Sequence, residues 1–304
     1  MPAPAAASGL RALLRGLRRD RWAQASAAVI VLFALAAVAA PLLSALEGQD
    51  PYTYHTELLD RANGTGAGVL GGISGDHWFG VEPLTGRDLF AIVVHGARTS
   101  FLIGLAATLV SAVIGVLLGA AAGYLGGRWD TVVSRATDVL LGFPQLIFMI
   151  SLGAVAPAAI PRPVLLIVVI GLFGWPRVAR VIRAQTLSLR DRDFVRAAKA
   201  LGAGPGHVFR RELLPNLWAP VIVLATVSIP EKIGMEAALS FLGVGIAPPT
   251  PSWGRSISDA IGWVKTDPMF LIFPGAALFV ATLAFNLLGD GLRDVLDPKT
   301  GVRR

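Results

Sequence analysis

The amino-acid sequence predicts an all-α integral membrane protein with six transmembrane helices. Of its 304 residues, 54% are hydrophobic and only 15% are charged, which is too few charges to cover the surface of a soluble protein of this size. The apolar residues are gathered into charge-free runs longer than the roughly 20 residues that a helix needs to cross a bilayer. The basic residues are concentrated in alternate connections between these runs, as expected for a membrane protein with a fixed orientation.

Four of the six spans follow from the absence of charge alone. The charge-free runs lie between Arg21 and Glu47, Arg98 and Arg128, Asp138 and Arg162, and Asp267 and Asp290. Two further spans are less regular. The run 163–176 is short, but its helix can continue to Val181 because the long stems of Arg177 and Arg180 reach the lipid headgroups. The run 217–242 is long enough but contains three charged residues.

The positions of Lys and Arg predict that both termini are cytoplasmic, because short loops rich in these residues stay on that side. Most of the 27 basic residues fall in four segments that would share the cytoplasmic side: 1–21, 128–135, 177–211 and 293–304. The net charge of +7 then reflects orientation and attraction to anionic lipid. No basic patch is interleaved with aromatic residues, so a nucleic-acid partner is not expected.

The spans divide the chain into five parts. Residues 1–21 form a basic amphipathic segment on the inner leaflet, and 22–46 form a first helix that is too long for a cleaved signal peptide. Residues 47–97 form an extracytoplasmic loop. Residues 98–292 hold the other five helices and a long cytoplasmic segment over 184–216. Residues 293–304 are a cytoplasmic tail.

Enzyme motifs are almost absent from the sequence. There is no cysteine, no zinc-protease motif and no phosphate-binding loop, so no catalytic, cofactor or metal site is predicted. His55, His77 and His95 are scattered and are expected to be solvated loop residues. The run Gly72-Ile73-Ser74-Gly75 resembles the nucleophile signature of rhomboid-type intramembrane proteases, but a flexible glycine-rich loop is the preferred interpretation.

Helix packing is indicated by small residues and prolines within the spans. Gly115, Gly119 and Gly123 are spaced four apart, which places them on one helix face and lets a second helix approach closely. Three prolines interrupt later spans, as is tolerated where neighbouring helices or water satisfy the freed backbone groups; they are Pro144, Pro157 and Pro230.

Three charges within the fifth span form a candidate translocation site. Lys232 and Glu236 are i, i+4 neighbours that can pair on one face, with Glu231 to one side. Charges at a helix centre are costly and face protein or water. The sequence leaves two interpretations open: a buried ion pair, or a polar site that lines a translocation path.

A short helix is predicted in the cytoplasmic segment. Its apolar face consists of Phe194, Ala197, Ala198 and Leu201, Asp191 or Asp193 can cap its start, and Gly202 can end it in a left-handed turn. A short exposed helix with alanines on its face has the shape to fit a groove on another protein.

At these residues the sequence resembles a known family. Ala197-Ala198, Gly202 and Leu214-Pro215-Asn216 resemble the EAA loop of ATP-binding-cassette (ABC) importer permeases, which here would span 184–216. Arg196 stands where the family usually has Glu. Four further blocks are similar to the C-type permeases of dipeptide and oligopeptide importers: Gly80 to Asp88, with Val81 and Glu82 departing from the pattern; Ala122 to Gly127; Ser240 to Gly254; and Phe285 to Asp294.

The resemblance implies a type I ABC importer permease fold in the cell (inner or plasma) membrane. The chain would form half of a pore with a second related permease, two ABC ATPase subunits and an extracytoplasmic solute-binding protein. It would not itself be an enzyme, and ATP-Mg would bind only in the ATPases. The residues implied in ATPase coupling are Phe194, Arg196, Ala197, Ala198, Leu201, Gly202, Leu214 and Pro215.

The cargo and one alternative class stay open at this stage. Peptide is the first choice, and nickel, glutathione or haem are carried by similar permeases. A self-sufficient secondary transporter or channel is the alternative from another class, in which Glu231, Lys232 and Glu236 would relay ions. Co-isolation with ATPase subunits distinguishes the two.

Overall fold

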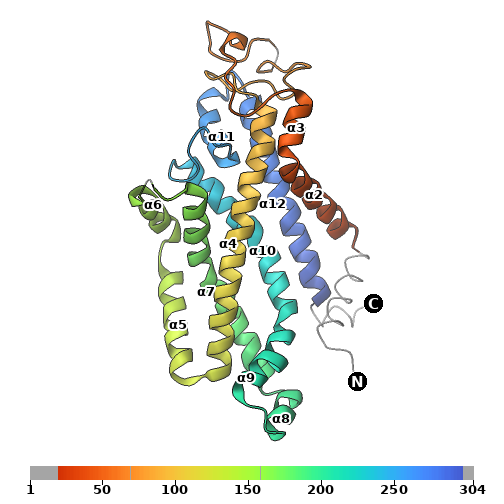
Figure 1. The fold of residues 1–304 in the computed structure, drawn as a ribbon, viewed down its shortest axis with the longest axis vertical. Helices are drawn as coiled ribbons and strands as arrows, with labels where there is room; N and C mark the ends of the chain where they lie inside the picture. Colours follow the sequence, from red (N-terminus) through yellow and green to blue (C-terminus); the bar gives the residue numbers. More distant parts are fainter. Residues whose placement is uncertain (1–19, 69, 158, 297–304) are drawn as a thin grey trace.

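The computed structural model describes residues 20–68, 70–157 and 159–296, and within them the chain forms helices and connecting loops without a named strand. Figure 1 shows an elongated bundle with a long loop at one end and the short helix α8 at the other. Most of the predicted amphipathic segment over 1–21 and most of the predicted tail over 293–304 lie outside the described residues.

The first predicted span is helical but has a break. It consists of α2 (Arg21–Val38) and α3 (Ala40–Glu47), with Pro41 in the first turn of α3. The side chain of Asp20 caps α2 by accepting hydrogen bonds from the backbone N–H groups of Trp22 and Ala23 at 2.9 and 3.2 Å. Beyond α3, the loop contains the short 3₁₀ helix η1 (Thr56–Leu58).

The second and third spans differ from the sequence-based boundaries. Helix α4 (Leu89–Leu125) starts at Leu89 rather than near Arg98, because the Asp88 carboxylate caps it through the Ala91 N–H at 2.7 Å. Its 37 residues extend over roughly 55 Å, beyond the thickness of a bilayer core. The third span is a broken pair, α5 (Gly127–Gly142) and α6 (Gln145–Val155), bent by 84° where Pro144 interrupts the helix.

The remaining helices complete the bundle. Helix α7 (Arg162–Arg190) passes through Pro176, so the short apolar run belongs to a full-length span. The other elements in order are α8 (Asp193–Ala200), α9 (Pro205–His207), the π-helical turn η2 (Val208–Leu213), α10 (Leu214–Phe241), α11 (Trp253–Ala260), η3 (Ile261–Trp263) and α12 (Met269–Leu296). The described residues thus contain five helices fit to cross a membrane, and six spans when the bent pair counts as one.

The predicted glycine face of α4 packs directly against α7. A Cβ atom added at Gly115 would lie 2.6 Å from the Val178 Cβ, and one added at Gly119 would collide with the Ala179 carbonyl oxygen. Helix α7 has glycines of its own facing α4, including Gly171 beside Val110. The two helices therefore approach each other as closely as small residues allow, which confirms the packing prediction.

An element not predicted from the sequence, α11, closes the loop end of the bundle (Figure 1). Its Trp253 is 1% exposed and donates a hydrogen bond from Nε1 to the Val93 carbonyl oxygen of α4 at 2.9 Å. The indole packs edge-on against Phe33 of α2 and Phe101 of α4. This aromatic cluster joins the first span to α4 and α11.

Candidate coupling and translocation sites

Helix α8 lies beyond the bundle, at the end opposite α3 and α11 (Figure 1). Val195, Val208 and Leu213 hold it there, and all three are fully buried against one another. The predicted carboxylate cap is wrong, since no side chain caps the helix and Asp193 lies in its first turn. Arg192 takes the N-cap position instead, and its carbonyl accepts from the Val195 and Arg196 N–H groups at 3.0 and 3.1 Å.

The predicted left-handed turn after α8 is present. Gly202 has a φ of +86°, and no atom lies within 4 Å of a Cβ added there. The Ala203 N–H donates to the Ala198 carbonyl and the Gly202 N–H to the Lys199 carbonyl, both at 3.0 Å. These two bonds close the helix end in the pattern typical of a glycine C-terminal cap.

The apolar side chains of α8 divide between two faces. Leu201 is 89% exposed, and Phe194 and Ala197 are also exposed, whereas Ala198 is half-buried against the Val195 cluster. The single face predicted for these four residues is therefore wrong for Ala198. Sequence analysis also missed Val195, which anchors the helix and would have been found by searching both faces for an apolar residue.

The loop is continuous with the fifth span. The π turn η2 runs directly into α10, whose first residues Leu214 and Pro215 are half-buried, while Arg196 on α8 is exposed. The Asn216 side-chain amide donates to the Glu212 carbonyl at 2.6 Å across this junction. Helix α8 is joined to this junction by packing as well as by the chain, since Val195 contacts Val208 and Leu213.

The three charged residues of α10 do not form one site. Glu236 is completely buried and accepts hydrogen bonds from three serines, Ser100 at 2.7 Å, Ser240 at 2.8 Å and Ser252 at 2.8 Å. Lys232 lies 3.7 Å from Glu231 instead, so the predicted Lys232–Glu236 pair is wrong. Because its three serines come from α4, α10 and the start of α11, Glu236 fastens these elements together.

Glu231 belongs to a row of ion pairs along α7. Arg177 donates to Glu231 and Arg180 to Asp138, each at 2.7 Å, and Arg183 pairs with Asp130. The three arginines are spaced i, i+3, i+6 on α7, and their carboxylates come from α5 and α10.

The Arg177 and Glu231 side chains are 65% and 36% exposed, although each lies near the middle of a long apolar helix. Exposed charges at such a depth face water or another protein rather than lipid tails. Sequence analysis assigned Arg177 and Arg180 to the headgroups and so missed this row; the threefold spacing of the arginines was the available signal.

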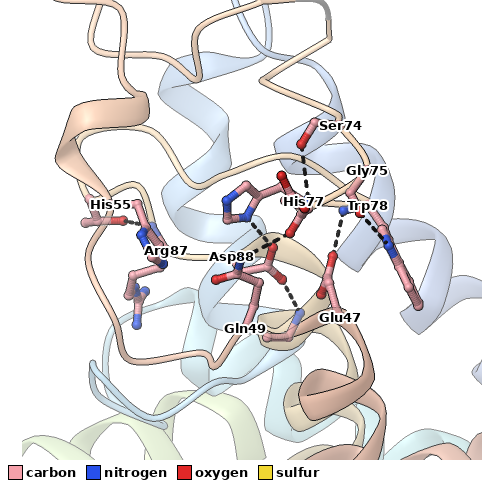
Figure 2. A network of polar contacts seen from close by, with 12 residues as sticks. Glu47, Gln49, His55, Ser74, Gly75, His77, Trp78, Arg87 and Asp88 are labelled. Carbon is pink, nitrogen blue, oxygen red and sulfur yellow. Dashed lines mark hydrogen bonds and ion pairs between the residues drawn. The ribbon is translucent and has the colours of Figure 1, made fainter.

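The loop before α4 is held by a polar network (Figure 2). His77 is 6% exposed, and its Nδ1 lies 2.9 Å from the Asp88 carboxylate that caps α4. His95 lies on α4 within 3.3 Å of the Ser44 hydroxyl. The expectation of solvated loop histidines is therefore wrong for both residues. Ser74, in the predicted flexible loop, accepts from the His77 backbone N–H at 3.1 Å, while the imidazole of His77 pairs with Asp88.

Arg87 links this loop to the segment before α11. Its guanidinium donates to both oxygens of Glu82, at 2.6 and 2.9 Å, and to the Pro249 carbonyl at 3.1 Å. Two sequence blocks far apart in the chain thus meet at one buried arginine. Glu82, which departs from the family pattern, supplies the carboxylate. Within the described ranges, no group of three His, Asp or Glu side chains could hold a metal ion.

Glu47 makes this network sensitive to pH. Its Oε1 accepts from the Trp78 N–H at 2.6 Å, its Oε2 is buried without a hydrogen-bond partner, and Asp88 lies beside it. Burial, reinforced by Asp88, raises the pKa of Glu47 from 4.5 to about 7. The folded loop therefore favours the protonated carboxyl, and its stability should be greatest below about pH 4.5 and fall as the pH rises through 7.

Replacing this carboxyl by an amide should remove that pH dependence. In Glu47→Gln, the amide oxygen can still accept from Trp78 and the NH₂ group can donate towards Asp88 at every pH. We expect cleavage of the loop by an added protease to increase from pH 5 to pH 8 in the wild type and to stay constant in the variant. The neighbouring His55 and His77 are present in both proteins, so an identical pH response would assign the effect to them and contradict the prediction.

Within the described ranges, five helices fit to cross a membrane, one broken helix pair and an exposed helix beyond one end define a polytopic helical membrane protein. Comparison with known protein families identifies the family of this membrane protein. Residues 115–302 match the model for the binding-protein-dependent transport system inner membrane component, and residues 9–63 match the N-terminal transmembrane domain of oligopeptide transport permease C.

Several curated proteins are similar over nearly the whole chain. The dipeptide transport system permease protein DppC of Alkalihalophilus pseudofirmus is 35% identical over 97% of this chain and 91% of its own length. The oligopeptide transport system permease protein OppC of Bacillus subtilis is 36% identical over 95% and 88%. The glutathione transport system permease protein GsiD of Escherichia coli is 37% identical over 94% and 89%. The chain belongs to the family of binding-protein-dependent transport permeases and is a multi-pass inner-membrane protein.

Proposed function

We propose that this chain is the permease subunit of an ABC importer for dipeptides or oligopeptides and that α8 couples it to ATPase subunits. The observation that carries the proposal is the position of α8. It projects beyond the bundle with Phe194, Ala197 and Leu201 exposed, while Val195 anchors it from the other side. An exposed apolar helix of this kind suits a groove on a partner protein.

The row of ion pairs supports a pore that is completed by a second permease. Arg177, Glu231 and Arg180 are exposed on α7 and α10 and would be unfavourable against lipid. A second related subunit facing this surface would enclose them around an aqueous path. The predicted path residues Glu231 and Lys232 fit this role, and the buried Glu236 fits a structural one.

The mechanism follows from the packing of α8 on η2 through Val195 and Val208, and from the direct continuation of η2 into α10. Closure of two ATPases around ATP-Mg would displace α8, and the π turn would pass this movement to α10. The ion pair between Arg177 of α7 and Glu231 of α10 would then shift as the bundle alternates between outward and inward states. In this orientation α8 and both termini face the cytoplasm, and the loop held by Arg87 meets an extracytoplasmic solute-binding protein.

Peptide is the proposed cargo because similar proteins carry the names dipeptide, oligopeptide and glutathione permease. All three names describe small molecules with peptide bonds, free carboxylates and free amines. A polar path with fixed charges of both signs is suited to such zwitterions, whereas no cluster of metal ligands is found in the described residues.

Purification and reconstitution test the proposal. Affinity purification of the full chain from membranes should co-isolate a second permease and two ATPase subunits. Proteoliposomes that contain this complex and its binding protein should accumulate dipeptide only with ATP-Mg. Uptake by the isolated chain, driven by an ion gradient, would instead support the secondary transporter.

A further inference from the structure

We propose that Lys232 and Arg177 form a carboxylate-binding station in the translocation path, which takes the C-terminal carboxylate of a peptide during its passage. The inference rests on the proposed function and names the substrate group that one part of the path contacts. It starts from an imbalance of charge at a small hollow between α5, α6, α7 and α10, which has room for about one water molecule in this conformation and would widen to admit a carboxylate as the bundle moves.

The hollow is lined by both cations. Gln145, Phe173, Gly174, Ser228 and Glu231 complete most of its wall. Gly174 provides the space that the Lys232 side chain occupies, because a Cβ atom at position 174 would lie 2.6 Å from the Lys232 Nζ. Glycine at this position therefore leaves room for an ammonium group beside the α7 backbone.

The charges around the hollow do not cancel. Arg180 and Arg183 each have a carboxylate of their own, Asp138 and Asp130. Arg177 and Lys232 share one carboxylate, that of Glu231. Among the described residues, no other carboxylate lies within 4 Å of either cation, so this group carries one unbalanced positive charge.

The geometry at Lys232 leaves capacity for a ligand. Its Nζ lies 3.7 Å from the Glu231 Oε1, beyond hydrogen-bond distance, whereas Arg177 Nη1 reaches the Glu231 Oε2 at 2.7 Å. Glu231 is therefore hydrogen-bonded to Arg177, and the three N–H donors of the Lys232 ammonium make no hydrogen bond to this carboxylate. The Lys232 side chain is 7% exposed, so an incoming anion would meet it in a poorly hydrated site where attraction is strong.

A peptide carboxylate matches both the unbalanced positive charge of this site and its unused hydrogen-bond donors. It carries one negative charge, and its two oxygens can accept from the ammonium and the guanidinium together. A peptide amide of the same length has the same backbone but lacks the charge. Comparing the two peptides therefore isolates the group that the station would recognise.

The test measures ATP-driven uptake of Ala-Ala and of Ala-Ala-amide in proteoliposomes holding the complete importer. The binding protein also selects among peptides, so the quantity compared is the ratio of the two uptake rates, with the same binding protein and different permeases. Lys232→Gln should lower the ratio of free to amidated peptide by about tenfold or more, because a hydrogen-bonded charge is lost. Lys265→Gln, at an exposed lysine outside the spans, is the matched control and should leave the ratio unchanged.

Two further variants keep the test decisive if Lys232→Gln fails to assemble. Arg177→Gln also removes one cation and should lower the ratio, whereas Glu231→Gln adds net positive charge and should maintain or raise it. If the Lys232→Gln importer is active and its uptake ratio is unchanged, a protein group balances the charge and the proposed carboxylate site is wrong. If Lys232→Gln is inactive, an unchanged ratio in Arg177→Gln leads to the same conclusion. Absence of ATP-driven uptake of either peptide by the wild type would instead overturn the proposed function.

Discussion

Leu201→Asp is expected to reduce ATP-driven uptake by roughly 30-fold or more while the chain still inserts and folds. Leu201 is 89% exposed and follows the last turn of α8, so its side chain supports no internal packing. If α8 enters an ATPase groove, a carboxylate there would be buried without a partner, and central apolar contacts of this kind contribute about 2 kcal/mol or more. The measurement is peptide uptake by proteoliposomes, together with the amount of ATPase that co-purifies.

A conservative change at the same position provides the control. Leu201→Met keeps an apolar side chain of similar volume and should retain most of the uptake. The thermal unfolding midpoint of both variants in detergent should match the wild type, which separates lost docking from lost folding. Normal uptake by Leu201→Asp would contradict the assignment of this surface to the ATPase.

Gly119→Val is expected to destabilise the bundle by about 3 kcal/mol, at the upper end of the range for overpacked cores. The obstacle is the backbone of α7 at Ala179, including its carbonyl oxygen, and backbone cannot move aside as a side chain does. The helices would have to separate along the face where α4 and α7 have their closest contact. The measurement is the thermal unfolding midpoint of the purified chain, alone and in the complex.

Gly275→Val is the matched control, because Gly275 lies within α12 and nothing occupies the space around a Cβ added there. It tests the same substitution in a membrane helix without the steric conflict and should change the midpoint little. Equal destabilisation by both variants would mean that valine itself, rather than the α4–α7 contact, is the cause.

Three elements of the bundle illustrate how far local sequence signals extend. Pro144 predicted an interruption and Gly202 predicted a left-handed turn, and both are present because each constraint belongs to the residue's own backbone. Helix α11 was not predicted, because its eight residues are too short and too mixed in polarity for a span. Its buried Trp253 depends on Phe33 and Phe101, which are distant in the sequence.

The candidate sites show the same division. The short helix at 193–200 and its exposed Leu201 follow from residue spacing and from the turn at Gly202, all within ten positions, although the predicted carboxylate cap was wrong. The partners of the charged residues of α10 could not be predicted from spacing, since the i, i+4 spacing favoured a Lys232–Glu236 pair. Three serines satisfy Glu236 instead, and Arg177 of α7 takes Glu231. A buried charge takes the best donor that packing brings near it, and sequence spacing includes only those on its own helix.

By itself, the sequence determined that the chain is a membrane protein, the approximate positions of its spans and the helix that projects between two of them, because hydropathy, helix length and turn formation act over short stretches. Only the tertiary structure decided that Arg87 joins the loop to Pro249, that Glu236 joins three elements and that Lys232 shares a carboxylate with Arg177. Those contacts unite residues from separate helices and loops, and their partners are fixed by how these elements pack.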